Sequence, residues 1–277
     1  MAAFTLLELL VVISIIAILA TLGFSALARA KSKAHAVECM NNERQLTVAC
    51  LIYVDEHDDY FPYNYGYDET QAAMNAGKYY NWANNLLNWD LDSYNTNSAL
   101  LGRGGLGPYG SGAVTIYKCP TDSVVSDEQR DAGWRNRVRS YSLNAMVGNA
   151  GEYTAGGTNV NNPGYRQFFK GAQIPDPSRI FLFIEEHPDS INDGYFLNHI
   201  DSFEWNDLPA AYHDGGAQIS FADGHVEYHR WQFPSTKPPP LPHAAAYPGS
   251  NPLPYAVPED ERGDFLWLMD RTSIKLP

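Results

Sequence analysis

An apolar run from Phe4 to Ala26 constrains this chain more than any other part of its sequence. As an α-helix it would be about 34 Å long, close to the ~30 Å thickness of a bilayer's hydrocarbon core. It contains one charge, the carboxylate of Glu8, and Arg29, Lys31 and Lys33 follow it. A carboxylate within such a run is costly unless it has a partner or a function. We therefore predict a membrane-inserted helix in which Glu8 has a specific role.

Two ordinary interpretations explain this run less well. A secretory signal peptide has a basic N-terminal region and a shorter apolar run, whereas almost nothing precedes Phe4. A plain membrane anchor does not explain why Glu8 lies inside the apolar stretch. The run is therefore expected to do more than anchor the chain.

The residues Phe-Thr-Leu-Leu-Glu-Leu-Leu-Val-Val-Ile at 4–13 resemble the start of the type IV prepilin family, which includes the pseudopilins of type II secretion. The resemblance implies a leader at 1–3, cleavage by a prepilin peptidase between Ala3 and Phe4, and methylation of the new N-terminus. Glu8 matches the glutamate at the fifth mature position. The family usually has Gly where Ala3 stands, and its leaders usually carry basic residues.

This resemblance implies a structural subunit, and not an enzyme, of a type IV pilus-like or type II secretion-like helical filament. The precursor would lie in the inner membrane through residues 4–26, and an assembly machinery would extract it into a homo-oligomeric filament in the periplasm or at the cell surface. In such a filament Glu8 would pair with the N-terminal amine of a neighbouring subunit. Because desolvation cancels much of the gain from such a pair, it would mainly set the stagger between subunits.

The helix is expected to continue well beyond the apolar run. Residues 27–54 are strong helix formers without proline, and the first clear stop is at 58–62. A single helix from Phe4 to about Asp55 would be about 78 Å long. The segment 27–57 is then the amphipathic half of the helix, which packs against a head.

The three cysteines are constrained by this helix. Cys39 and Cys50 share one of its faces with Leu46, but their separation along the axis is about 16 Å. A disulfide requires Cα atoms within about 7 Å, so these two cannot pair with each other. Cys119 could bridge to either one in an oxidising compartment, and we favour Cys39. The alternative is three buried free thiols.

The head, residues 58–277, is predicted to be rich in β-strands and loops. Expected strands lie at 115–119, 139–144, 180–185, 218–221 and 225–231, and expected surface loops at 102–112 and 148–164. Asp223-Gly224 between apolar runs indicates a hairpin turn. Residues 233–258 hold nine of the 18 prolines and should be extended, and 264–270 should form a short closing helix or strand. The fold class is therefore α+β, pilin-like, with a long N-terminal helix packed on an antiparallel sheet.

A second resemblance covers much of the head. His213, nine residues and Asp223-Gly224 match a C-terminal H-x9-DG pattern found with prepilin-type leaders in Planctomycetes and Verrucomicrobia. The segments 39–42, 53–62, 119–120 and 139–144 are similar to further parts of that pattern. The resemblance indicates a type of subunit and no substrate.

Composition excludes one class of partner. The net charge is −13 and 44% of the residues are hydrophobic, so the chain can build a core but offers no basic surface for nucleic acid.

Two acidic or histidine-rich segments are candidates for metal binding, with Ca²⁺ as the expected ion of the first. Asp55, Asp58 and Asp59 supply carboxylate oxygens at the end of the long helix, although a Lys or Arg from the head could neutralise them instead. Around the hairpin, His213 and Asp223 are candidate ligands. The competing interpretation is that Asp223 only forms the turn and that His213 hydrogen-bonds its backbone.

A different class of function also fits the sequence. The aromatic runs at 63–67 and 79–82 could stack on sugars, which suggests a membrane-anchored protein with a carbohydrate-binding or hydrolytic head. Glu185-Glu186-His187 could pass for an acid–base group, but a strand end followed by a polar loop explains it equally well. The sequence contains no nucleophile elbow, phosphate-binding loop or HExxH motif.

Overall fold

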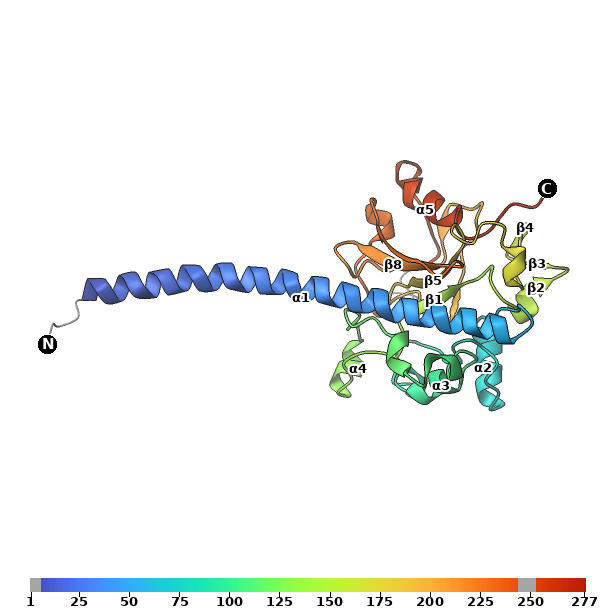
Figure 1. Ribbon diagram of the computed structural model, residues 1–277, viewed down its shortest axis with the longest axis horizontal. Helices are drawn as coiled ribbons and strands as arrows, with labels where there is room; N and C mark the ends of the chain where they lie inside the picture. Colours follow the sequence, from blue (N-terminus) through green and yellow to red (C-terminus); the bar gives the residue numbers. More distant parts are fainter. Residues whose placement is uncertain (1–5, 244–252) are drawn as a thin grey trace.

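The computed structural model describes residues 6–243 and 253–277, except for the side chains of residues 22–26, 28 and 29. One long helix, α1 (Leu6–Glu56), dominates it, and the N-terminal part of this helix projects away from the rest of the chain (Figure 1). Its 51 residues span about 77 Å. The predicted uninterrupted helix is confirmed over the described residues, and it ends one residue beyond Asp55.

The head is built around a five-stranded sheet with the order β6-β1-β5-β8-β9. The strands are β1 (Tyr141–Asn144), β5 (Phe181–Glu185), β6 (Tyr195–Phe196), β8 (Gly216–Phe221) and β9 (Val226–Arg230). Neighbouring strands are antiparallel except β1 and β6, which are parallel. Four of these strands match the predictions at 139–144, 180–185, 218–221 and 225–231. The α+β class is therefore confirmed.

The segment between α1 and β1 was predicted wrongly. It contains three short helices, α2 (Tyr67–Asn75), α3 (Ser98–Arg103) and α4 (Asp127–Asp131), and the expected strand at 115–119 forms a 3-10 helix, Val114–Tyr117. Local caps explain two of the helices. The side chains of Ser126 and Gln129 cap each other's backbone N–H groups, and Asn97 accepts a hydrogen bond from the Ala99 N–H at 3.1 Å. Helices of five to nine residues are too short to show an apolar periodicity from which they could be predicted.

The two expected surface loops also contain structure. Residues 148–164 include β2 (Thr154–Ala155), β3 (Thr158–Asn159) and the first part of β4 (Asn162–Arg166), which form a small sheet. Residues 102–112 include the end of α3 and a 3-10 turn at Pro108–Gly110. The proline-rich segment adds β10 (Tyr255–Ala256), which pairs with β7 (Glu204–Trp205). The closing element at 264–270 is a helix, α5 (Arg262–Met269), and residues 244–252 lie outside the described residues.

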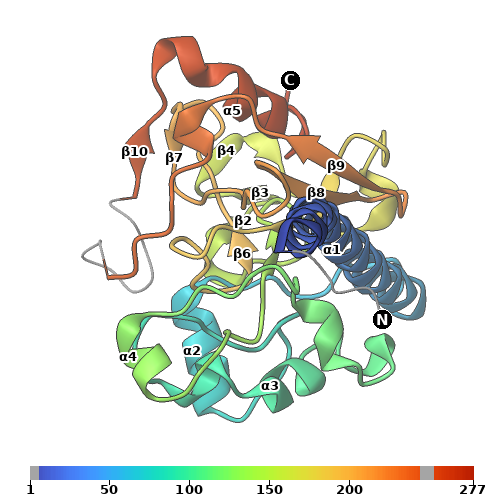
Figure 2. The ribbon, with the colours of Figure 1, turned by 90° about the vertical axis from the view of Figure 1, so that its left-hand side faces the viewer.

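Hydrophobic cores lie on both faces of the five-stranded sheet. One core joins the face that carries Leu143 and Phe183 to Cys39, Leu46 and Cys50 of α1. The other joins the opposite face to α5. Viewed along its axis, α1 runs between the half of the head that holds the strands and the half that holds α2, α3 and α4 (Figure 2). The C-terminal half of α1 is therefore an integral part of the head, as the amphipathic pattern predicts.

Candidate functional site

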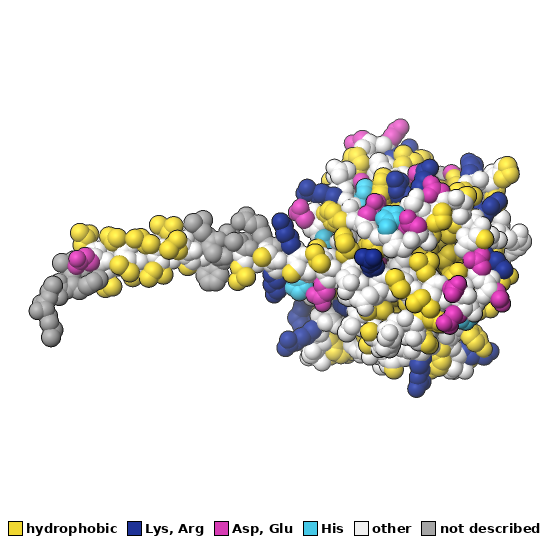
Figure 3. Space-filling model, in the orientation of Figure 1, with side chains coloured by type: hydrophobic (Ala, Val, Ile, Leu, Met, Phe, Trp, Pro, Cys, Tyr) yellow, Lys and Arg dark blue, Asp and Glu magenta, His cyan; other side chains and the backbone are white. Residues whose placement is uncertain are grey.

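The N-terminal part of α1 exposes its apolar side chains on all sides. We call residues 6–19 the stem. Its large apolar side chains are between 44% and 76% exposed: Leu6, Leu7, Leu9, Leu10, Val11, Val12, Ile13, Ile15, Ile16, Ile18 and Leu19. Figure 3 shows the stem as an almost unbroken apolar surface, with the carboxylate of Glu8 as its charged group. An exposed apolar surface of this extent marks a binding site for another apolar surface.

The polar residues of the stem region are compatible with apolar surroundings. The Ser14 hydroxyl donates to the Leu10 carbonyl at 2.7 Å, and the Thr21 hydroxyl donates to the Ile18 carbonyl at 2.8 Å. These hydroxyl groups therefore have partners within the helix and need no water. Ala3 and Phe4 lie outside the described residues, so cleavage and methylation there stay predictions. Within the part of the chain that the structure describes, no helix reaches both the length and the apolarity of a membrane span.

A disulfide joins α1 to the head. Cys39 in α1 is bonded to Cys119, 80 residues further along the chain, and their Cα atoms lie 5.0 Å apart. The favoured pairing is therefore confirmed, and the alternative of three free thiols is wrong. Cys50 remains a free thiol, and burial raises its pKa to about 12. The bond closes a long loop and holds the helix against the sheet.

His213 and Glu185 lie directly beside this disulfide. Nε2 of His213 is 3.5 Å from Sγ of Cys119 and 3.1 Å from Oε1 of Glu185. The other oxygen of Glu185 accepts a hydrogen bond from the Gln218 N–H at 2.8 Å, which fixes the carboxylate. These four residues and Cys39, the other half of the disulfide, are all buried. We call Cys39, Cys119, Glu185 and His213 the junction cluster.

Glu43 adds a second carboxyl group near the junction cluster. It lies one helical turn after Cys39, and its side chain is fully buried. Burial and then the neighbouring Glu185 raise the pKa of Glu43 well above its ordinary value. Both carboxyl oxygens lie outside hydrogen-bonding geometry with every described group. The backbone of Ser220 is nevertheless close enough to oppose part of the rise in the pKa of Glu43. Glu43 was not predicted from the sequence, although its four-residue spacing from Cys39 places it on the buried face.

The carboxylates at the acidic end of α1 do not converge on one point among the described residues. Asp58 and Asp59 adopt left-handed backbone conformations, with φ of 52° and 70°. The Asp59 carboxylate accepts the Ala172 N–H at 3.0 Å, and the Lys170 ammonium donates to the Asp58 carbonyl at 3.1 Å. Asp55 is exposed. Among the described residues no group of metal-binding side chains forms here. Ca²⁺ binding by Asp55, Asp58 and Asp59 therefore stays a prediction.

The hairpin does not bring its predicted metal ligands together either. The six residues of β8, about 20 Å of strand, separate His213 from Asp223. Asp223 instead accepts the backbone N–H of His225 at 3.1 Å, and Gly224, with φ of 93°, completes the turn. The turn was therefore predicted correctly. The expected hydrogen bond from His213 to the backbone of the turn was wrong, because the His213 ring instead contacts Cys119 and Glu185.

The two polar residues that follow β5, Glu186 and His187, are buried, and burial favours the uncharged form of each. Burial raises the pKa of Glu186 to about 8, and burial lowers the pKa of His187 to about 4. The Nε2 of His187 lies 3.0 Å from the Pro238 carbonyl. Because a donor must face that carbonyl, Nε2 of the neutral ring carries the proton. The contacts of His187 fit a structural group at the end of a strand.

The aromatic runs are only partly available to a ligand. Trp82 is fully buried, and its Nε1–H donates to the Gly194 carbonyl at 3.0 Å. Tyr63, Tyr79 and Tyr80 line a shallow hollow of about 300 Å³. The tyrosines could therefore contact a ligand, whereas Trp82 could not.

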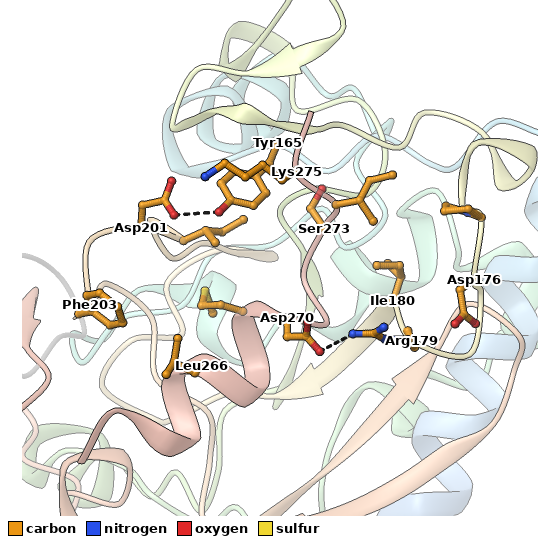
Figure 4. Close-up of a pocket in the computed structure, with 14 residues that line it drawn as sticks. Tyr165, Asp176, Arg179, Ile180, Asp201, Phe203, Leu266, Asp270, Ser273 and Lys275 are labelled. Carbon is orange, nitrogen blue, oxygen red and sulfur yellow. Dashed lines mark hydrogen bonds and ion pairs between the residues drawn. The ribbon is translucent and has the colours of Figure 1, made fainter. Parts of the chain in front are cut away.

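Two further hollows lie on the head. One of about 580 Å³ beside α5 has charged and polar side chains that pair with each other: Arg179 with Asp270 at 2.6 Å and the Tyr165 hydroxyl with Asp201 at 2.8 Å (Figure 4). The other, of about 410 Å³, combines carboxyl, amide and tyrosine groups. It is lined by Gly66, Tyr67, Asp68, Tyr153, Asn161, Asn192, Asp193, Tyr195, Leu197, Asn206 and Asp207. We call this second hollow the acidic groove.

Burial favours the protonated form of two carboxyl groups in the acidic groove. Burial raises the pKa of Asp193 to about 7 and that of Asp207 well above its ordinary value. The rings of Tyr153 and Tyr195 stack with their centroids 5.6 Å apart. Aromatic faces beside carboxyl and amide groups suit a polyhydroxylated ligand, because they combine apolar contact with hydrogen bonding.

Comparison with known proteins gave no relative of this chain. No protein-family model matches it, and neither the curated proteins nor the solved structures contain a match. Its function is therefore argued from its own residues.

Proposed function

We propose that this chain is a pilin or pseudopilin, a structural subunit that assembles through α1 into a type IV pilus-like or type II secretion-like helical filament. The observation that carries the proposal is the stem, an exposed apolar helix that continues without a break into a helix half clamped to the head. An ordinary soluble domain does not leave so many large apolar side chains in water.

The shape of the apolar surface favours copies of the same helix as the final partner. A helix that packs on one surface has an apolar stripe, whereas the stem is apolar around its whole circumference. A bundle of identical stems covers all sides at once. The heads carry the chain's net negative charge and would face outward. Before assembly, residues 4–26 would lie in the inner membrane, and cleavage before Phe4 by a prepilin peptidase would create the amine that pairs with Glu8.

Imaging of a Glu8 variant tests this proposal. Full-length protein, expressed with a prepilin peptidase and an assembly machinery, is expected to form filaments that are visible by negative-stain electron microscopy. Glu8→Gln should insert into the membrane normally and yield at least about tenfold fewer filaments, because it removes the charge that pairs with the N-terminal amine. Glu38→Gln is the matched control, since Glu38 is an exposed carboxylate on the same helix. Normal filaments from Glu8→Gln would contradict the role of Glu8, and no filaments from the wild type would contradict the proposal.

A second candidate function is a carbohydrate-binding head, and the acidic groove favours it. Tyr67, Tyr153 and Tyr195 meet Asp193 and Asp207 there. Isothermal titration of the wild type with soluble polysaccharides tests this function. Tyr153→Ala should abolish any heat of binding, whereas Tyr228→Ala, a tyrosine outside this groove, should leave it unchanged.

A further inference from the structure

The junction cluster contains more chemistry than a disulfide requires. Among the described residues, one group of four metal-binding side chains comes together: Cys39, Cys119, Glu185 and His213. Their donor atoms lie within 4.8 Å of one another, and all four residues are buried. A disulfide is uncharged and needs neither a carboxylate nor an imidazole beside it. The two groups bond to each other at 3.1 Å, which offsets part of the free energy that their burial costs, and they present an imidazole and a carboxylate to the two sulfurs.

The donor set matches one metal well. Two sulfurs, one imidazole nitrogen and one carboxylate oxygen are ligands that Zn²⁺ binds in tetrahedral sites. With Zn–ligand bonds of about 2.0–2.3 Å, the corners of such a tetrahedron lie roughly 3.3–3.8 Å apart. The His213–Cys119 distance of 3.5 Å and the His213–Glu185 distance of 3.1 Å are already close to these values. The two sulfurs must separate further, as they do when their bond is broken.

We propose that, when Cys39 and Cys119 are thiols, they bind one Zn²⁺ together with Nε2 of His213 and the carboxylate of Glu185. The disulfide and the zinc site exclude each other. Conversion requires a dithiol, which transfers two electrons and two protons to the Sγ–Sγ bond and itself becomes a disulfide. Zinc then displaces the two thiol protons to solvent, because the thiolates are the ligands. In both states α1 remains cross-linked to the head.

The surroundings of the cluster fit a bound cation. The Gln218 N–H holds one oxygen of Glu185 at 2.8 Å, which is the outer hydrogen bond that a metal-binding carboxylate needs. Glu43 lies one helical turn from Cys39, fully buried, with both oxygens outside hydrogen-bonding geometry. A dication between these elements would favour the charged form of Glu43 and offset its repulsion with Glu185. This inference is independent of filament formation.

Metal titration of the full-length protein in detergent tests the proposal. After reduction by a dithiol and removal of the reductant under anaerobic conditions, the protein should bind one equivalent of Zn²⁺, measured by elemental analysis. Co²⁺ in its place should give thiolate-to-cobalt charge transfer and the visible bands of a tetrahedral site. The oxidised protein should bind neither metal in this way. Zinc should also raise the Tm of the reduced protein, because it binds the folded form.

Variants assign the ligands. Cys39→Ser should abolish the cobalt–thiolate signal of a two-sulfur site. Glu185→Gln should weaken binding by more than the ~10–100-fold that loss of an outer partner costs. Cys50→Ser is the matched control, since it removes the remaining thiol and should leave stoichiometry and spectrum unchanged. Circular dichroism of each variant checks that it is folded.

Three results would overturn metal binding by the two cysteines. These are a reduced wild-type protein that binds no metal, a two-thiolate signal of full intensity that survives in Cys39→Ser, and a signal that disappears in Cys50→Ser. A folded Glu185→Gln variant with unchanged affinity would remove Glu185 from the ligand set and refute the four-ligand site as stated.

Discussion

The two halves of α1 belong to one uninterrupted helix, yet they meet different surroundings. The stem exposes apolar side chains on every side and contacts nothing in the head. The C-terminal half buries Cys39, Leu46 and Cys50 and is bonded to the head through Cys119. Among the described residues, the large apolar side chains of the stem are exposed, whereas those of the second half pack against the head. This difference is the reason why we propose the stem as the assembly surface, while the junction holds the second half of α1 to the head.

The largest expected effect comes from a charge in the stem. Ile16→Asp should abolish assembly, because a carboxylate at the centre of an apolar helix costs about 2.5–3.5 kcal/mol in each subunit. The head should keep its urea midpoint, since Ile16 contacts none of it. Ile16→Met is the apolar control and should assemble. Filament counts by electron microscopy and Trp fluorescence in urea measure the two responses. Assembly by the Asp variant would show that the stem is not the assembly surface.

The next effect concerns the junction. Replacing Cys39 and Cys119 together by Ala should lower the free energy of unfolding of the head by about 4 kcal/mol, because the disulfide closes a loop of 80 residues in the unfolded chain. Urea denaturation without reductant and with a metal chelator measures this loss. A loss below about 1 kcal/mol would indicate that packing alone holds α1 against the sheet.

Two matched substitutions in α1 distinguish its buried face from its exposed face. Leu46→Ala should destabilise the head by about 2–5 kcal/mol, because Leu46 is fully buried and its truncation leaves a cavity. Val48→Ala, two residues away on the exposed face, should change stability by no more than about 0.5 kcal/mol. Urea midpoints of both variants provide the comparison. Equal losses would mean that the exposed face also contacts the head.

The sequence predicts the parts of this fold that depend on local pattern. The uninterrupted helix, four strands of the large sheet and the turn at Asp223-Gly224 follow from composition, periodicity and turn chemistry. The short helices α2–α4 could not be predicted, because they are too short to show an apolar period and two of them depend on local caps such as that of Ser126. The edge strand β6 has only two residues and therefore gives no pattern.

The candidate site was predicted in part, for a similar reason. Helix geometry excludes a bond between Cys39 and Cys50, and this left Cys119 as the partner. Nothing local places His213 and Glu185 at the same point, because that proximity arises only when β5 and β8 pair under α1. Glu43 was missed because a carboxylate within an amphipathic pattern is ordinarily assigned to the solvent face.

The smallest predicted effect concerns Glu43, and it tests whether the junction is built for a cation. Burial and Glu185 raise the pKa of Glu43 in the folded protein, so the folded state holds its proton at pH values where the unfolded state has lost it. The contribution of Glu43 to stability is therefore greatest below its unfolded pKa of about 4.3 and decreases as pH rises toward its folded pKa. Glu43→Gln should remove this decrease, so its stability gain over the wild type in the disulfide form should be larger at pH 8 than at pH 5.

Urea midpoints at pH 5 and pH 8 measure this effect, with Glu38→Gln as the exposed control on the same helix. Because burial holds the pKa of His187 near 4, its own contribution increases from pH 4 to about 6.5 and opposes that of Glu43. The difference between variant and wild type isolates Glu43, since His187 is common to both. If zinc occupies the thiol form, the advantage of Glu43→Gln should shrink or reverse there, because the dication stabilises the Glu43 carboxylate. An equal advantage in both forms would place Glu43 outside the influence of the junction.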